Sequence, residues 1–270
     1  MINPYVSYHY YIPFYLYYYD LITSFCLYIS IFAVILYTLL IKDTPIFMEK
    51  EQKKAKYSKE EEVVNTITHS IGAVGTLVVC GIFAVQVYEK GNGLDFLSII
   101  LMLLGVSISY IFSSVYHGIS HTNPVKQTLR KFDHASIFWH IAACYSPITL
   151  IAFLRGGEIT LGWGMFIFCW LFAAVGSAML LRKVNEKSIL ETAIYVLMGL
   201  TIVFAIKTFY DIVGFDTVMW VILEGVAYIT GAVLYCVHKV KYMHSVFHVF
   251  IMLGDAFHFV AVSKIISGML

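Results

Sequence analysis

The sequence predicts an all-α integral membrane protein: a seven-transmembrane helix bundle, to which the N-terminal residues could add one further helix. Of the 270 residues, 60% are hydrophobic and 13% are charged, with a mean hydropathy of +0.79. A soluble domain of this length cannot bury so much apolar surface. The apolar residues also fall into segments of about 20, the length that a bilayer-spanning helix needs, and loops rich in basic residues alternate with loops that contain few.

Composition excludes several other classes of protein. The formal charge of +1 argues against nucleic acid as a partner. No phosphate-binding glycine loop, internal repeat or soluble domain is visible, so no soluble protein partner is evident. The five cysteines are odd in number and all lie in apolar segments, which predicts small buried hydrophobes rather than disulfides or a thiolate metal site. They are Cys26, Cys80, Cys144, Cys169 and Cys236.

Residues 1–47 form a tyrosine-rich, apolar extension with two interpretations. The run 21–41 is long enough to span a bilayer, but it lacks the basic start and the small-residue cleavage motif of a signal peptide. Met48 follows it and would serve as a later start. The extension is therefore either an additional helix or an over-extended reading frame.

The polar stretch that follows is predicted to be a cytoplasmic linker of residues 48–65, in front of a seven-helix membrane domain of residues 66–270. Ser58 with Glu61 three positions later forms a capping box, which predicts a helix that begins near Lys59. Along that helix, Glu61, Asn65 and His69 are spaced four residues apart and share one face.

Seven apolar segments have the length of spanning helices, and short connections join them. Pro147 lies inside the third segment and is expected to kink it. The segments are 67–88, 94–116, 134–154, 160–181, 189–209, 217–237 and 245–266.

Basic residues predict the orientation, because Lys and Arg in short loops mark the cytoplasmic side. Of the 18 basic residues, 14 lie in the linker before the first segment and in the second, fourth and sixth loops. Residues 42–65 are therefore predicted to be cytoplasmic and the chain to be a multi-pass protein of the cell membrane. The other four are Lys90, Arg155, Lys207 and Lys264.

Several polar side chains converge on the cytoplasmic side in this topology. His244 and His248 lie one helical turn apart at the start of the seventh segment. His117 ends the second segment and Asp133 precedes the third. His69 enters the first segment from the same side.

Three imidazoles and one carboxylate match a zinc site. The predicted metal ligands are His117, Asp133, His244 and His248. A zinc ion with three protein ligands lowers the pKa of a bound water towards about 7, which suits hydrolysis of an amide or ester bond in a lipid. Asp133 is either the fourth ligand or the base that holds the water. Ser113, one turn before His117, is placed to contact a ligand or a developing oxyanion.

Other polar residues leave their roles open. Asp255 and His258 either line a polar cavity beneath the site or pair with each other, and pairing is favoured. Glu224 and His140 are either satisfied inside the bundle or face a cavity. His121 and His134 flank the candidate ligands and could replace one of them, whereas His238 is interpreted as an interfacial residue. Interfacial histidines also bind lipid headgroups, so a purely structural role for the cluster stands beside the metal site.

The motifs resemble the hemolysin III proteins, the bacterial branch of the progestin and adipoQ receptor family, which includes the adiponectin receptors. The likeness covers residues 58–268. It rests on the spaced Glu61, Asn65 and His69, on SSVYHGISHTNP and LRKFDH, on CYSP in the third segment, and on His244-x-x-x-His248 through His258-Phe259. Asp255 stands where the family usually has a small residue, and residues 1–47 have no counterpart in the pattern.

The resemblance implies a seven-helix fold with a cytoplasmic N-terminus and a zinc ion near the cytoplasmic face, held by the four residues already named. Related receptors and alkaline ceramidases suggest hydrolysis of a ceramide-like amide, with membrane lipids as partners. The bacterial branch takes its name from a pore-forming, lytic activity.

Three functions therefore compete. The first is a zinc-dependent lipid amide hydrolase, ceramidase-like, or a lipid sensor, with Asp133 and Ser113 as catalytic candidates. The second is a pore-forming hemolysin in which the histidine cluster is structural, and lysis would then need a homo-oligomer or disruption of the bilayer. The third is a membrane-homeostasis protein that binds zinc and lipid without turnover.

Overall fold

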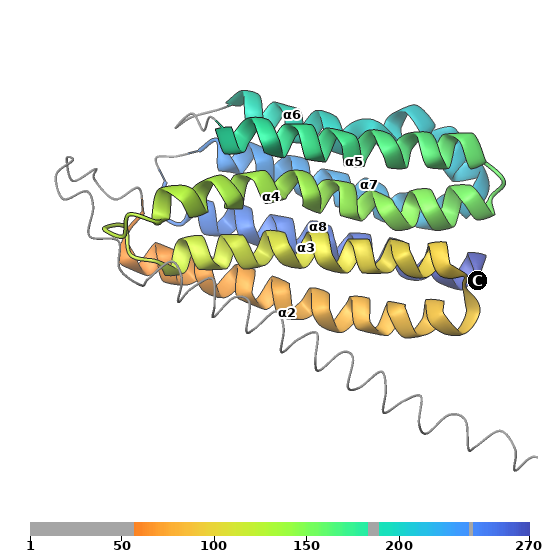
Figure 1. Ribbon diagram of the computed structural model, residues 1–270, viewed down its shortest axis with the longest axis horizontal. Helices are drawn as coiled ribbons and strands as arrows, with labels where there is room; N and C mark the ends of the chain where they lie inside the picture. The colour runs from red at the N-terminus through yellow and green to blue at the C-terminus, as the bar shows by residue number, and fades with distance from the viewer. Residues whose placement is uncertain (1–56, 183–188, 238–239) are drawn as a thin grey trace, which may run out of the picture. The chain divides into compact units, whose positions relative to one another are not determined.

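The computed structural model describes residues 57–182, 189–237 and 240–270, and within these ranges the chain is helical without strands (Figure 1). The prediction of an all-α membrane protein is confirmed. The expectations for residues 1–47 lie outside the described residues. In chain order the elements are α2 (Lys59–Lys90), α3 (Gly93–Gly118), α4 (Lys126–Pro147), the π-helix η1 (Ile148–Phe153), α5 (Ile159–Arg182), α6 (Ile189–Gly199), the 3-10 helix η2 (Leu200–Ala205), α7 (Ile206–Tyr235) and α8 (Met243–Met269).

The count of seven separate spanning helices is off by one. In the described part of the chain, six helices are long and apolar enough to cross a membrane. The predicted segments 189–209 and 217–237 are joined in one helical stretch, Glu191–Tyr235, of 45 residues. At 1.5 Å per residue this stretch would be about 68 Å long if straight, roughly twice the thickness of the hydrocarbon core.

The long stretch is not straight, because the chain reverses direction at Gly214. This glycine has φ 76° and ψ 172°, a conformation that residues with a Cβ rarely adopt. Figure 1 shows that α6 and α7 run in opposite directions. Consistently, Tyr195 of α6 donates a hydrogen bond to the His134 carbonyl, and the Tyr235 hydroxyl of α7 lies 3.5 Å from Nε2 of the same histidine.

The start of α2 confirms the predicted capping box. The Ser58 hydroxyl accepts from the Glu61 amide at 3.3 Å, and the Glu61 carboxylate accepts from the Ser58 amide at 2.8 Å. The same carboxylate accepts from the Tyr242 amide at 2.8 Å. Tyr242 is the residue before α8 and has a left-handed conformation, φ 61°. Glu61 therefore ties the start of α8 to the start of α2.

The two faces of α2 have the polarity expected of a helix in contact with lipid. Its outer face exposes a stripe of branched apolar side chains, although apolar residues are usually buried. Its inner face buries Asn65, His69 and Thr76. An apolar outside with polar groups inside is the arrangement expected in a bilayer. The exposed stripe comprises Ile67, Ile71, Val74, Val78 and Ile82.

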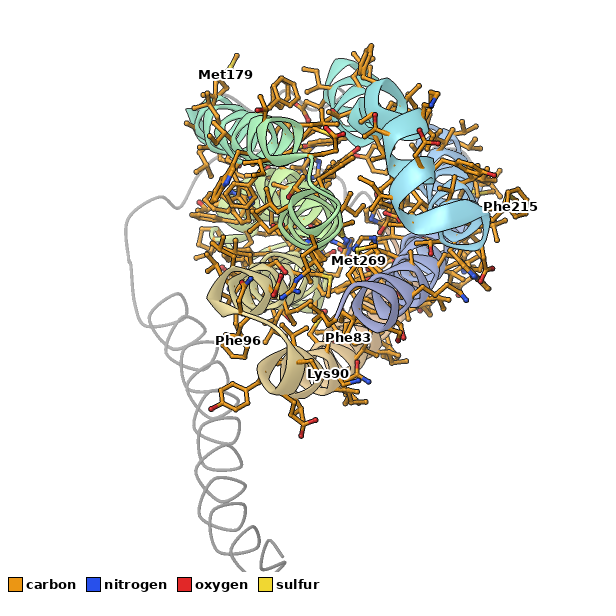
Figure 2. All side chains as sticks on the ribbon, turned by 90° about the vertical axis from the view of Figure 1, so that its right-hand side faces the viewer. Phe83, Lys90, Phe96, Met179, Phe215 and Met269 are labelled. Atoms are coloured by element: carbon orange, nitrogen blue, oxygen red, sulfur yellow. The ribbon has the colours of Figure 1, made fainter. Side chains whose placement is uncertain are left out.

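α4 is the most enclosed of the six spans, with 83% of its most apolar window buried. It packs against α3 and α5, and α7 packs against α8 (Figure 2). A Cβ on Gly105 of α3 would lie only 2.8 Å from the Trp139 carbonyl oxygen of α4, so glycine permits this close approach. Pro147 ends the regular part of α4, and η1 follows at the predicted irregularity.

An ion pair joins two elements at the end of the bundle where α3 begins. Asp95, in the first turn of α3, accepts from the Asn92 amide in a second capping box and is almost fully buried. Arg155, in the loop before α5, donates to both oxygens of this carboxylate. These hydrogen bonds raise the pKa of the Arg155 guanidinium. The pair joins α3 to the loop after η1, far from the histidines described next.

Candidate metal centre

Three histidines from two helices place their side chains together at the end of the bundle where α2 and α8 begin. His117 comes from the last turn of α3, and His244 and His248 come from the first turns of α8. One ligand atom from each lies within 4.8 Å of the other two. His117 and His248 are almost fully buried. The helical spacing of four residues therefore aims both α8 imidazoles at His117, as the sequence predicts.

The spacing of the ring nitrogens fits a single bound ion. Nε2 of His244 lies 3.2 Å from Nε2 of His117 and 3.1 Å from Nε2 of His248. Two nitrogens at 2.0–2.1 Å from one tetrahedral zinc ion would lie about 3.3–3.4 Å apart. These two pairs of donors are therefore within a few tenths of an ångström of the spacing that a shared zinc ion needs.

A carboxylate fixes the orientation of His117. Nδ1 of His117 lies 2.5 Å from Oε2 of Glu62, and an ionised carboxylate can only accept, so Nδ1 carries the proton. Nε2 then presents its lone pair to the other two histidines. Glu62 is itself held by Lys126, whose ammonium donates to Oε1 at 2.7 Å and to the Ile119 carbonyl at 2.7 Å. A carboxylate behind a histidine is the usual partner of a metal ligand.

A hydroxyl fixes His248 in the same way. Thr68 lies 3.2 Å from Nδ1 of His248 and donates its only proton to a backbone carbonyl of its own helix, that of Val64 or Asn65. Thr68 can therefore accept from Nδ1 of His248, which fits a tautomer with an unprotonated Nε2. With Nδ1 protonated, both His117 and His248 would present Nε2 to a metal ion.

Aromatic rings enclose the cluster from two sides. Tyr57 stacks on His244 with ring centroids 4.8 Å apart and an interplanar angle of 18°. Burial raises the pKa of the Tyr57 phenol, so it stays neutral. His69 stacks on His248 at 3.5 Å, and neither of its ring nitrogens has a hydrogen-bond partner among the described residues. These rings restrict the rotation of the two α8 imidazoles.

Asp133 and Ser113 lie beside the three histidines rather than within the triad. Asp133 is not part of the group whose ligand atoms lie within 4.8 Å of one another. It lies near enough to Ser113 and His117 to interact with both, and Oδ2 lies 3.3 Å from Nδ1 of His134. Its side chain is 14% exposed. The arrangement favours the water-holding role for Asp133 over the role of fourth ligand.

A cavity of about 410 Å³ runs from this cluster into the bundle. Asp133, Ser113, His244 and His248 line one part of it, and apolar side chains of α4, α6, η2, α7 and α8 form most of its wall. Concave, largely apolar pockets with a few convergent polar groups are typical of sites for small molecules. The cluster therefore borders a space suited to an apolar chain with a polar end.

Glu62→Gln tests whether the carboxylate supports metal binding. Glutamine keeps the shape but loses the charge that stabilises the Nδ1 proton of His117, so we expect zinc affinity to fall about 10–100-fold. Competition with a chelating dye on purified protein measures this. Glu60→Gln is the matched control, because Glu60 is exposed in the same helical turn. An equal loss in both variants would assign the effect to the helix start instead.

One residue of the candidate metal centre was not predicted from the sequence. Glu62 was missed, because the four-residue spacing pointed to Glu61, whose carboxylate is used by the capping box and by Tyr242. Spacings of three and four also place Glu62, Asn65 and His69 on one face, and this signal could have found it. Asn65 is buried and accepts from Ser245 at 2.6 Å.

The favoured pairing of Asp255 with His258 is wrong. Asp255 instead lies 2.8 Å from Nε2 of His140, and His258 lies 3.0 Å from Glu224. The other histidines flanking the candidate ligands are not in the triad: His121 is exposed in the loop after α3, and His134 contacts Asp133 and Tyr235. His238 lies outside the described residues.

Comparison with known proteins places the chain in a family. The family model described as "Haemolysin-III related" matches residues 57–259, a range that includes His117, His244 and His248. "Hemolysin-3" of Bacillus cereus is 28% identical over 214 residues, which are 79% of this chain and 95% of that protein. "Hemolysin-3 homolog" of Bacillus subtilis (strain 168) is 29% identical over 206 residues, 76% of this chain and 94% of that protein. The chain is therefore a multi-pass membrane protein that belongs to the haemolysin-III related family.

Proposed function

We propose that the chain is a zinc-dependent hydrolase of lipid amides, ceramidase-like, with its site in the cytoplasmic half of the cell membrane. The observation that carries this proposal is the convergence of three histidine Nε2 atoms, two of them from His244 and His248, which line a largely apolar cavity. Polar and ionisable groups are costly inside a membrane and usually mark function. The positive-inside distribution of Lys and Arg supports the cytoplasmic assignment.

The residues divide into ligands and reacting groups. His117, His244 and His248 would hold the zinc ion, which supplies a Lewis acid that polarises a carbonyl and acidifies water. Asp133, beside the triad, would orient the attacking water, accept its proton and return a proton to the departing amine. The Ser113 hydroxyl would donate a hydrogen bond to the carbonyl oxygen as it becomes negative. The apolar cavity would take the acyl chain.

A lytic function is the second candidate, and the names of the Bacillus relatives favour it. In that interpretation the histidine cluster is structural. Among the described helices, the exposed apolar face of α2 and the enclosed α4 offer no polar stripe for a wide aqueous pore. Lysis would therefore need association of several copies or disruption of the bilayer.

The test uses the full chain purified in detergent. It is incubated with a long-chain ceramide and with other lipid amides in mixed micelles, and the release of free fatty acid is measured. We expect release that a chelator stops and added zinc restores. Failure of the zinc-loaded protein to release fatty acid from any of these amides would overturn the hydrolase proposal.

Leakage of dye from lipid vesicles distinguishes the lytic function from the hydrolase function. Vesicles loaded with dyes of graded size are mixed with the wild-type chain and with His244→Ala. We expect no leakage from either protein at concentrations that support hydrolysis. Size-limited leakage that survives the loss of His244 would favour the lytic function with a structural cluster.

A further inference from the structure

A second cluster of ligand-type side chains lies deeper in the bundle than the three histidines. His140 and Cys144 are one turn apart on α4, and Asp255 faces them from α8. One ligand atom of each lies within 4.8 Å of the others, and all three residues are buried. Asp255 follows His248 by seven residues, or about 10 Å along the helix axis. The two clusters are therefore separate.

The Asp255 carboxylate is oriented from several sides. Oδ1 accepts from Tyr228 at 2.5 Å and from Nε2 of His140 at 2.8 Å, and Oδ2 accepts from Tyr110. These donors come from α3, α4 and α7. The two phenols would remain in place if His140 gave up its proton, so they would hold the carboxylate as outer partners of a ligand.

His258 supplies the observation that hydrogen bonding alone does not explain. Its Nδ1 lies 3.0 Å from Oε2 of Glu224, and this carboxylate accepts the Nδ1 proton. Its Nε2 is fully buried and has no hydrogen-bond partner among the described residues. The Cys144 thiol lies near both His258 and His140. A carboxylate behind one nitrogen and an unpartnered second nitrogen is the pattern of a histidine prepared for a metal.

We propose that His140, Cys144 and Asp255 form a second metal site, with Nε2 of His258 as the fourth donor. Two nitrogens, one sulfur and one oxygen suit a borderline-soft divalent ion such as zinc. Binding would release the Cys144 thiol proton and leave His140 as a neutral imidazole. The thiolate and the Asp255 carboxylate then balance the double charge of the ion. This proposal departs from the expectation that Cys144 is only a small buried hydrophobe.

Cobalt distinguishes the two sites, because the three-histidine centre contains no thiolate. The full chain in detergent is stripped with a chelator and titrated with Co²⁺ alone. We expect two ions per chain and, with one of them, an intense near-ultraviolet band from charge transfer between thiolate and Co²⁺. Cys144→Ser is expected to lose the band and one ion. Cys169→Ser is the matched control, because Cys169 is a fully buried thiol on α5, and it should retain both.

Co²⁺ binding at the three-histidine centre serves as a separate measure of correct folding. Cys144→Ser should still bind one Co²⁺ ion, which shows that the bundle is intact, and His244→Ala should keep the thiolate band although it loses the other ion. A wild-type titration without the band, or a band that persists in Cys144→Ser, would overturn the second site. Neither result bears on hydrolysis, so this proposal and the proposed function fail independently.

Discussion

His248→Ala is expected to remove one zinc ion per chain relative to the wild type. His248 presents its lone pair 3.1 Å from Nε2 of His244, and its other nitrogen is held by Thr68. Alanine would leave two donors, and two imidazoles do not complete a zinc site that needs three protein ligands. The loss is therefore expected to be nearly complete rather than graded. Elemental analysis of purified protein after removal of free metal measures it.

His121→Ala is the control for this measurement. His121 lies four residues after His117, but it is exposed in the loop between α3 and α4. It should keep the full zinc content. Unchanged zinc in His248→Ala would show that the histidines form a hydrogen-bonded cluster, and the hydrolase proposal would lose its basis. Equal loss in both variants would point to general damage at this end of the bundle.

Asp133→Asn is expected to keep its zinc and lose lipid amide hydrolysis by about 10²–10⁴-fold, the usual contribution of a general base. Asparagine has nearly the shape of aspartate, so the neighbouring histidines are not disturbed, but it cannot accept a proton from water. Asp133 lies outside the triad and lines the cavity, which is why metal retention is expected. Zinc content and the rate of fatty acid release are measured on the same preparation.

Asp211→Asn provides the same substitution in an exposed position. Asp211 pairs with Lys207 on the surface of α7, away from the cavity-lining residues. Its zinc content and hydrolysis should match those of the wild type. Loss of zinc in Asp133→Asn would instead assign Asp133 as the fourth ligand. If Asp133→Asn keeps both its zinc content and the wild-type rate of hydrolysis, Asp133 has no role in the proposed mechanism.

The candidate site was predictable from sequence where local rules apply. The capping box at Ser58 and the four-residue spacing of His244 and His248 depend only on helix geometry, and both hold in the structure. Charge patterning and segment length identified the spans. The gap left between the predicted segments 189–209 and 217–237 contains Gly214, where the chain reverses, although helix geometry alone did not reveal that the two segments are joined in one helical stretch.

Partners from distant helices were less predictable. Glu62 and Glu61 are adjacent in sequence but about 100° apart around α2, and which one faces His117 depends on the rotation of the whole helix. The contact between Asp255 and His140 joins residues 115 positions apart, and no periodicity encodes it. Local pattern therefore identifies candidate ligands, whereas tertiary packing decides which of them meet.

The link between Glu61 and the Tyr242 amide also bears on the order in which the protein is made. The triad joins the last turn of α3 to the first turns of α8, the last described helix, and Thr68 of α2 and His248 are separated by 180 positions. During synthesis α2 and α3 enter the membrane while α8 has not yet been translated. Until then, His117 has Glu62 behind it but no second imidazole in front of it. Binding of an ion by all three histidines would therefore be confined to the final stage of assembly, and an occupied centre would mark a chain in which α8 has packed against α2.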